Sequence, residues 1–375
     1  MRTPGFLRML ILVIVAVLWT VSAAAQNDEA TLRFRLAQSF EQSGDWERAA
    51  IVYESLHAGD PQNYVFFDGL RRSYTQLKQY EKAIALVRSR LRMNPNDPML
   101  SASLGGLFYQ MGEEATADSV WKSVIRSGPS NPNLYRLVAS QMIEYRLYEQ
   151  AIAVYNEARG ATGKSDLFAE ELGSLYGALL QYESAAREYV EILRTRPQQL
   201  SYVQSRLSTF INRPDGLQSA FRVAKEAIRR TPDNGSLRSL LAWLHMENRD
   251  FESALTEYRA IDQLVKSNGT EILNFAQRAG QERAFSVAAK AYQEVIDRYP
   301  RRPDIPHAKL GFARSMEELS SEGVSPVPPV SPQPGSPERG PVAESKPDVA
   351  GILSLYERII GDYPNSDVAA QALFR

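Results

Sequence analysis

Side chains able to carry out acid–base or metal chemistry are few and scattered in this sequence. The three histidines, His57, His245 and His307, lie far apart, and no pair has the His-x-x-x-His spacing that holds a metal on one helix face. The chain has no cysteine, which excludes disulfides and thiol-bound metals. It also lacks a glycine-rich phosphate loop and a Gly-x-Ser-x-Gly elbow. The sequence therefore predicts no catalytic residue, no cofactor and no metal site.

The charged residues exclude a further class of protein. Adjacent carboxylates such as Glu170 and Glu171 diverge on a helix, as on a solvated face. Without Arg2 and Arg8 the chain carries 41 basic and 44 acidic residues, a net charge of about −3. A nucleic-acid protein normally shows a concentrated basic face. We therefore expect no nucleic-acid partner.

The strongest pattern is a repeat of 34 residues. Eight aligned units begin at residues 30, 64, 98, 132, 166, 201, 235 and 269, with one extra residue before the sixth. Position 20 is always alanine: Ala49, Ala83, Ala117, Ala151, Ala185, Ala220, Ala254 and Ala288. Position 7 is always large and apolar: Leu36, Leu70, Leu104, Val138, Leu172, Leu207, Leu241 and Phe275. Proline closes six units: Pro61, Pro95, Pro129, Pro197, Pro232 and Pro300.

Each unit is predicted to form two short helices that break between positions 14 and 15. Positions 4, 7, 8 and 11 share one face of the first helix, and positions 20, 24 and 27 share one face of the second. Neither helix can bury its face alone, and alanine at position 20 lets the two backbones approach closely. Proline at position 32 ends the second helix. Gly163 and Lys266 replace this proline and Glu114 replaces the usual aromatic residue at position 17, so we expect units three, four and seven to bend irregularly.

This pattern resembles the tetratricopeptide repeat over residues 30 to 302. The resemblance implies an all-α fold, an α-solenoid of stacked helix-turn-helix repeats that forms a right-handed superhelix. Residues 26–302 would then hold eight repeats. The segment 356–375 also resembles repeats of outer-membrane assembly lipoproteins and periplasmic cell-division coordinators, which indicates an envelope location.

Residues 303–375 continue the pattern with an interruption. Ile305 to Leu319 and Val349 to Gly361 are predicted to be the two helices of a ninth repeat. Residues 320–347 between them contain eight prolines, and we expect a disordered spacer there. Its P-x-x-P segments could instead bind a proline-recognising domain. Val368 to Phe374 would begin a tenth repeat with an uncovered edge, so either the natural chain continues or this edge forms a homo-oligomer.

Residues 1–25 are predicted to be a cleaved export signal peptide. Arg2 and Arg8 precede an apolar run from Met9 to Val21, and Ala23-Ala24-Ala25 supplies the cleavage site. An uncleaved anchor is the alternative, but thirteen apolar residues are fewer than the roughly twenty that span a bilayer. Without cysteine the signal cannot belong to a lipoprotein. We therefore expect an exported bacterial protein, periplasmic or extracellular, with no stable membrane span.

The sequence predicts a non-catalytic interaction scaffold that binds a peptide or partner protein of the cell envelope. The resemblance implies that positions 2, 5, 9, 12 and 13 of the first helices face the ligand in a concave groove. Residues at these positions with side chains suited to binding are Arg72, Tyr109, Arg136, Arg213 and Trp243. They predict a mildly cationic, aromatic groove for a ligand with some acidic character. The alternative is an accessory region of a longer enzyme or outer-membrane assembly machine.

Overall fold

The computed structural model describes residues 29–321 and 349–375, which form helices and short turns and contain no strand. The expected signal peptide lies outside the described residues, as does most of the proline-rich segment. The chain divides into two compact units, residues 1–167 and 168–375. Each unit is a stack of helix pairs, which confirms the all-α solenoid. The right-handed superhelix remains a prediction, because it concerns the path of the chain through both units.

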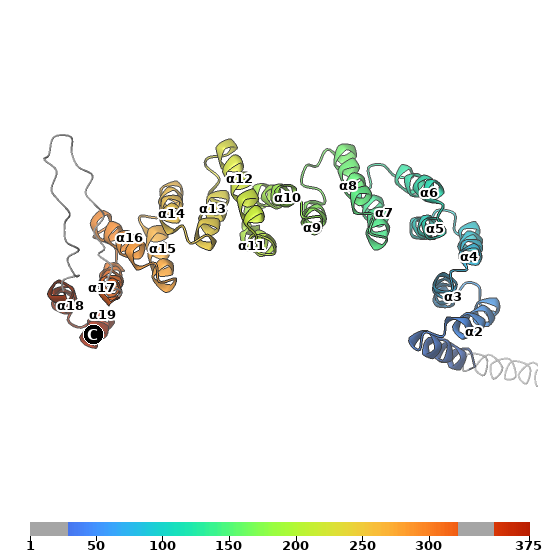
Figure 1. The fold of residues 1–375 in the computed structure, drawn as a ribbon, viewed down its shortest axis with the longest axis horizontal. Coiled ribbons are helices and arrows are strands. Elements are labelled where there is room, and N and C mark those ends of the chain that lie inside the picture. The colour runs from blue at the N-terminus through green and yellow to red at the C-terminus, as the bar shows by residue number, and fades with distance from the viewer. Residues whose placement is uncertain (1–28, 322–348) are drawn as a thin grey trace, which may run out of the picture. The chain divides into compact units, whose positions relative to one another are not determined.

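Unit 1 contains four helix pairs. The helix at residues 29–42 precedes α2 (Trp46–Gly59), α3 (Tyr64–Gln76), α4 (Tyr80–Met93), α5 (Pro98–Gln110), α6 (Glu114–Arg126), α7 (Pro132–Glu144) and α8 (Tyr148–Thr162). The first helices α3, α5 and α7 lie along one side of the unit, and the second helices α4, α6 and α8 lie along the other (Figure 1). The two sides therefore present different side chains to solvent.

Unit 2 continues the same alternation. Its helices are α9 (Ala169–Ala178), α10 (Tyr182–Thr195), the 3-10 helix η1 (Pro197–Gln199), α11 (Leu200–Leu207), α12 (Pro214–Arg230), α13 (Gly235–Glu247), α14 (Phe251–Val265), α15 (Thr270–Gln281), α16 (Phe285–Arg298), α17 (Ile305–Ser321), α18 (Val349–Asp362) and α19 (Asp367–Leu373). Although residues 322–348 separate them, α17 and α18 pack together, and Tyr356 Oη donates to Glu317. Helix α17 runs through Ser320 and Ser321, so the predicted spacer begins two residues too early.

Short polar residues determine where the first helices begin. The side chains of Asn63, Asp97, Asn131 and Asn234 each accept a backbone N–H from the first turn that follows. Such caps satisfy donors that have no partner inside the helix. Pro98 and Pro132 occupy the first helical position, where no backbone donor is required. The turn sequences between repeats therefore set the helix boundaries locally.

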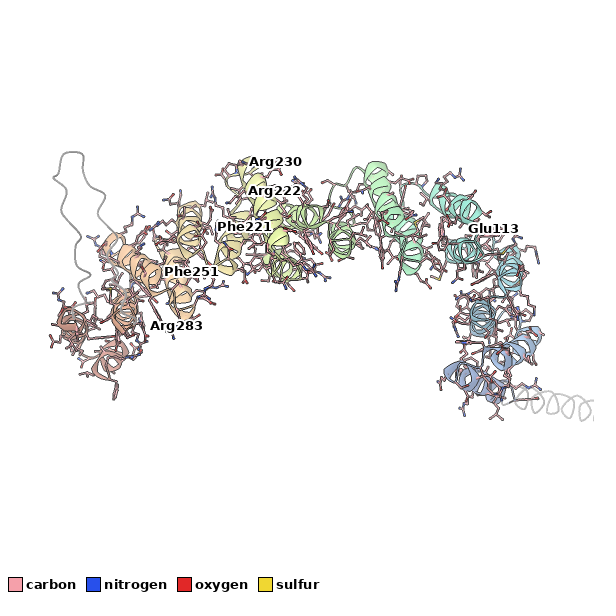
Figure 2. All side chains as sticks on the ribbon, in the orientation of Figure 1. Glu113, Phe221, Arg222, Arg230, Phe251 and Arg283 are labelled. Carbon is pink, nitrogen blue, oxygen red and sulfur yellow. The ribbon has the colours of Figure 1, made fainter. Side chains whose placement is uncertain are left out.

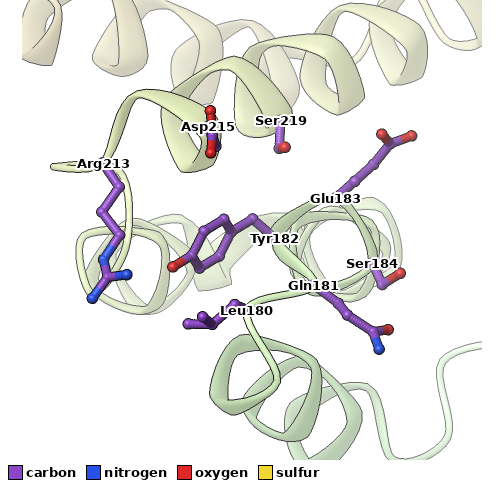
Figure 3. Close-up of a pocket in the computed structure, with 8 residues that line it drawn as sticks. All are labelled: Leu180, Gln181, Tyr182, Glu183, Ser184, Arg213, Asp215 and Ser219. Carbon is purple, nitrogen blue, oxygen red and sulfur yellow. The ribbon is translucent and has the colours of Figure 1, made fainter.

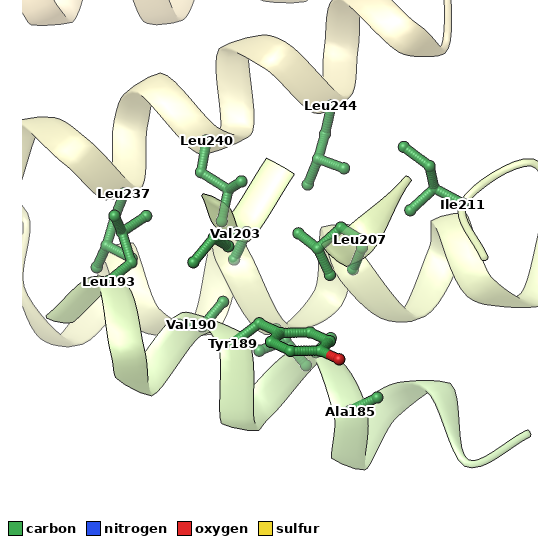
Figure 4. Close-up of a cluster of buried hydrophobic side chains, with 14 of the residues drawn as sticks. Ala185, Tyr189, Val190, Leu193, Val203, Leu207, Ile211, Leu237, Leu240 and Leu244 are labelled. Carbon is green, nitrogen blue, oxygen red and sulfur yellow. The ribbon is translucent and has the colours of Figure 1, made fainter. Parts of the chain in front are cut away.

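The repeated alanines lie where the two helices of each pair meet. All eight position-20 alanines are at most 1% exposed, so the predicted close approach is present in every repeat. In unit 2, side chains of α10 to α13 interlock around Leu193, Leu207 and Leu240 (Figure 4). Trp243, predicted to face a ligand, belongs to this same cluster and is 7% exposed. Trp243, at position 9, is buried because neighbouring helices cover α13 on more than one side. Leu244 and Met246 on α13 are buried as well.

Two repeat ends that lack proline use other means to turn the chain. Helix α8 ends at Gly163, which adopts a left-handed conformation with φ +69°. Helix α14 ends at Lys266, also left-handed, and the carboxylate of Asp262 holds the turn that follows. Asp262 is 3% exposed and accepts the backbone N–H groups of Gly269 and Glu271. A buried side chain therefore replaces the missing proline in the seventh repeat.

Candidate functional site

Unit 1 contains a hollow of about 380 Å³ on the side formed by its first helices. We name it the α3–α5–α7 groove, after the helices that supply its lining. The lining residues are Tyr64, Arg71, Arg72, Thr75 and Gln76 from α3, Met99, Leu100, Ser103, Leu107 and Gln110 from α5, and Leu137, Gln141, Glu144 and Tyr145 from α7 and its end. The lining therefore combines apolar and polar side chains.

The cations of this groove have partners within the protein. Arg72 pairs with Glu41 at 3.1 Å and with Asp68, and Arg71 pairs with the same Asp68 at 2.8 Å. Glu41 also accepts the hydroxyl of Tyr53 at 2.9 Å. Arg72 therefore lines the groove, but its charge is already neutralised. Because its charge is paired, Arg72 gives no support to the expected preference for an acidic ligand. The sequence alone did not reveal these partners.

Uncharged amides are the second polar feature of the groove. Gln76 and Gln110 occupy position 13 of successive repeats, and Glu144 follows at the same position. The Oε1 atom of Gln110 is buried and has no hydrogen-bond partner. Gln141 donates to Glu144 at 3.2 Å. These glutamines were not among the predicted site residues, although glutamine at position 13 of the first three repeats, Gln42, Gln76 and Gln110, is visible in the sequence.

Aromatic rings support the groove at its α7 end. Tyr109, a predicted site residue, packs against Tyr145 with ring centroids 5.3 Å apart and against Trp121 at 6.2 Å. Tyr109 itself does not line the groove, whereas Tyr145 does. Burial and the nearby Glu144 raise the pKa of Tyr145 to about 12. Its hydroxyl therefore stays protonated at neutral pH and can donate a hydrogen bond.

A more open hollow of about 520 Å³ lies in unit 2 beside the start of α10 and the start of α12. Arg213, another predicted site residue, lies on its rim with Tyr182, Asp215 and Leu180 (Figure 3). Tyr182 stacks on Phe210, with ring centroids 5.1 Å apart. This hollow is lined from the starts of second helices, so it is not the groove of first helices in which Arg213 was predicted to face a ligand.

The remaining predicted site residues lie elsewhere. Arg136 is exposed on α7 but lines neither hollow. The buried Trp243 is a correction to the predicted set, because a side chain 7% exposed in a hydrophobic core offers little surface to a ligand. The predicted residues therefore do not form one site. Arg72 and Arg213 each line a hollow, in separate units.

Salt bridges connect the second helices α10 and α12 of unit 2. Glu183 on α10 pairs with Arg187 on the same helix and with Arg222 on α12, while Glu226 on α12 pairs with Arg187 and Arg230. Arg222 and Arg230 both project from α12 (Figure 2). Such exposed pairs link neighbouring repeats but contribute little stability each. This surface therefore has its charges matched within the protein.

His245 is a buried titratable residue of unit 2. His245 contacts Asp250 at 3.2 Å and packs against the Phe221 ring at 4.8 Å. Burial lowers the pKa of His245 below its usual value. Within residues 29–321 and 349–375, no group of three or more histidine, aspartate or glutamate side chains is placed to hold a metal ion. What the described surface offers is grooves for binding.

Comparison with known proteins identifies the repeat. A family model described as "Tetratricopeptide repeat" matches residues 31–63, the first predicted unit and its boundary. Residues 31–63 therefore form a tetratricopeptide repeat. The helix pairs that continue at the same spacing through both units show that the repeats extend beyond the matched segment.

Other similarities are distant. The chain is 21% identical over 230 residues to "BBSome complex member BBS4" of Bos taurus, which covers 61% of this chain and 44% of that relative. It is 28% identical over 92 residues to "Tetratricopeptide repeat protein 28" of Homo sapiens, covering 24% of this chain and 4% of that protein. The chain thus spans less than half the length of either relative.

The similarity to solved structures is also low. A tetratricopeptide repeat protein from Parabacteroides merdae is 13% identical, covers 63% of this chain and 93% of its own, and gives a TM-score of 0.31. A MamA fragment from Desulfovibrio magneticus is 17% identical, covers 46% and 97%, and gives 0.29. The fold assignment rests on the helix pairs and the family match. In the described part of the chain, each helix is too short or too polar to cross a membrane.

Proposed function

We propose that this protein is a non-catalytic interaction scaffold that binds a peptide or partner protein in the α3–α5–α7 groove. The observation that carries this proposal is the groove itself: three successive first helices line one hollow, and a buried amide oxygen of Gln110 there lacks a partner. Tetratricopeptide repeats present such surfaces to other proteins, and the chain has no catalytic motif among its residues.

Part of the proposal concerns location, namely the envelope of a bacterial cell. Its support is the sequence of residues 1–25, with a basic start, an apolar run and an Ala-x-Ala site. Fractionation of the expressing bacterium and N-terminal sequencing of the mature protein test this. A mature chain that starts at Gln26 in the periplasm or medium is expected. A full-length chain in the cytoplasm would contradict the export proposal.

A variant that fills the groove tests the binding proposal. Ser103 lines the groove, and Ser103→Phe places a ring in the hollow without touching the core. Ser123 is exposed on α6, on the opposite side of the unit, so Ser123→Phe is the matched control. Partners cross-linked to the tagged protein in the envelope fraction are identified by mass spectrometry. We expect Ser103→Phe to lose at least one partner that the parent and Ser123→Phe retain, and equal capture by all three proteins would contradict the proposal.

Self-association through the edge formed by α19 is a separate proposal. Leu373 is 69% exposed and Phe374 is 92% exposed, so both present apolar surface. We expect light scattering to show a mass that rises with concentration, and Leu373→Ser with Phe374→Ser to remove the rise. A monomer mass at every concentration for the parent chain would reject self-association.

A further inference from the structure

Helix α4 is the most basic of the second helices of unit 1. It holds one acidic side chain, Glu81, and four basic ones: Lys82, Arg88, Arg90 and Arg92. Within the part of the chain that the structure describes, none of these four cations forms a salt bridge. In unit 2, by contrast, Arg222 and Arg230 on α12 are both paired with carboxylates (Figure 2). The charge of α4 is therefore not matched by ion pairs among the described residues.

An aromatic ring holds one of these cations in place. The guanidinium carbon of Arg88 lies 5.4 Å from the centroid of the Phe108 ring on α5. A ring face attracts a cation without cancelling its charge, and the five N–H donors of a guanidinium lie in its own plane. Among the described residues, no acceptor binds these donors of Arg88, which is exposed. Arg88 is thus positioned with free donors, an arrangement suited to bidentate binding of an anion.

Arg92 adds a second exposed cation beside Arg88. It follows four residues later, so the two side chains leave the same face of α4 about 6 Å apart along the helix axis. Arg90 points to another face and donates to the backbone carbonyls of Pro61 and Gln62, where it holds the turn before α3. The cations that α4 offers as a pair are therefore Arg88 and Arg92.

The carboxylates around α4 restrict the shape of an anionic partner. The second helices before and after it, α2 and α6, carry the exposed Glu47, Glu54 and Glu114. A membrane surface or a nucleic-acid duplex would extend over these helices and bring negative charge near the carboxylates, and such like-charge contact is unfavourable. A narrow acidic segment that follows α4 alone avoids them. The distribution of charge therefore favours an acidic stretch of polypeptide.

We propose that the outer face of α4 is a second binding surface, which takes a short acidic segment of a partner protein whose carboxylates pair with Arg88 and Arg92. In an extended segment, side chains at alternate positions lie about 6.6 Å apart on one side, close to the spacing of the two arginines. Binding there breaks no ion pair of the protein, since neither arginine has one among the described residues. The surface lies outside the α3–α5–α7 groove, so the inference does not depend on the proposed function of that groove.

Binding of an acidic peptide tests this proposal. The probe is a fluorescently labelled, C-amidated octapeptide of alternating serine and glutamate, and the serine–glutamine octapeptide is its uncharged counterpart. Fluorescence anisotropy gives the affinity of each peptide for the purified chain without residues 1–25, first in low salt and then in high salt. We expect the glutamate peptide to bind more tightly in low salt. High salt should remove the difference, because it screens exposed ion pairs.

Matched variants locate the interaction. Arg88→Gln with Arg92→Gln should weaken binding of the glutamate peptide about fivefold, since two exposed ion pairs are lost. Arg222→Gln with Arg230→Gln removes the same charge from α12, where both arginines are exposed and already paired, and should leave binding unchanged. Ser103→Phe, which fills the α3–α5–α7 groove, should also leave it unchanged. Circular dichroism confirms that all three proteins are folded.

Several results would overturn the inference. These are no binding of the glutamate peptide, equal binding of the two peptides, equal affinities of the two arginine double variants, or loss of binding in Ser103→Phe. Vesicles of phosphatidylglycerol and a DNA duplex serve as broad anionic probes. If either bound the parent but not the α4 double variant, the surface would belong to a membrane or a nucleic acid instead. None of these results except the one with Ser103→Phe involves the groove, whose role is tested separately by cross-linking.

Discussion

Single glycines provide the closest packing inside the repeats. A Cβ built on Gly105 would lie 2.5 Å from Nε1 of Trp121, and one built on Gly173 would lie 2.6 Å from the Tyr189 ring. Trp121 and Tyr189 both occupy position 24 of their repeats, so the small position 8 residue accommodates the aromatic ring of the second helix. Tyr53 and Tyr292 make the same kind of contact with glycines of the following repeat.

The close contact predicts a stability cost at Gly105. Gly105→Ala must push the Trp121 ring aside and should lower the free energy of unfolding by about 1–3 kcal/mol, the usual range for overpacking. Gly160→Ala is the matched control, since Gly160 lies in α8 with open space around it. The control should gain up to about 1 kcal/mol from helix propensity. Urea denaturation measures both, and a stable Gly105→Ala protein would contradict the packing described.

The buried His245 and the half-buried His57 predict a loss of stability in mild acid. Burial lowers the pKa of both His245 and His57, so the folded state takes up protons only below the pH at which the unfolded chain does, near 6.5. Their stabilising contribution is complete above pH 6.5 and is lost as the pH falls below it. Desolvation has the largest effect on the pKa of His245 and lowers it. The nearby Asp250 raises this pKa, and Lys225 lowers it.

Thermal melting between pH 7 and pH 5 measures this effect. The melting temperature of the parent should fall over that range, and His245→Gln should reduce the slope while keeping a side chain able to contact Asp250. The double variant with His57→Gln should be flatter still. Carboxylates with lowered pKa values, such as Glu183 and Asp304, titrate below this window. A slope unchanged by both substitutions would show that other groups cause it.

At the scale of the helix pair, the turn between the two helices has one recurring conformation. Position 15 is left-handed in seven of the eight repeats, at Gly44, Lys78, Gly112, Arg146, Leu180, Arg249 and Arg283. Only two of these are glycine, the residue that adopts this conformation without steric cost. The sixth repeat differs: Arg213 is extended, Pro214 starts α12, and Gly216 lies against the Phe210 backbone. The turn is therefore imposed by the packing of the pair.

This strain predicts a stabilising substitution. Lys78→Gly removes the cost of placing a side chain in the left-handed region, but it also makes the unfolded chain more flexible. The net effect should be a rise in the free energy of unfolding of about 0.5–1 kcal/mol. The reverse change, Gly44→Ala, should lower it by a similar amount. Denaturant midpoints report both. Destabilisation by Lys78→Gly would mean that the lysine side chain contributes more than its backbone costs.

The turn after α14 depends on one buried carboxylate. Asp262 accepts from Gly269 N at 2.9 Å, from Ser267 Oγ and from Tyr299 Oη at 3.3 Å. Asp262→Ala leaves these donors without an acceptor and should cost about 1–3 kcal/mol. Asp233→Ala, at an exposed turn, is the control expected to change little. Equal melting temperatures for the two variants would rule out the role assigned to Asp262.

At the scale of the whole molecule, each repeat contacts mainly its neighbours in sequence. Stability in such a stack is a sum of local terms, and a defect should not spread far. Ala185 is fully buried between α9 and α10, so Ala185→Leu should force that pair apart. We expect faster hydrogen exchange in α9 to α12 and unchanged exchange in α3 to α5. A uniform increase along the chain would indicate one cooperative domain instead.

The sequence by itself determined the fold class and the repeat. Alanine at position 20, large residues at position 7 and the polar caps before α3, α5, α7 and α13 act through local geometry and spacing, and these are legible along the chain. They predicted the buried alanines and the helix pairs.

Only the tertiary structure decided which side chains remain available to a ligand. Arg72 is neutralised by Glu41, which lies 31 residues earlier, and Trp243 is covered by neighbouring helices. Gln110 has a buried amide oxygen without a hydrogen-bond partner because of what surrounds it on α5 and α7. Repeat position fixes only the direction of a side chain from its helix. Its partners come from other helices, since salt bridges and burial depend on distance in space and not on spacing in the sequence.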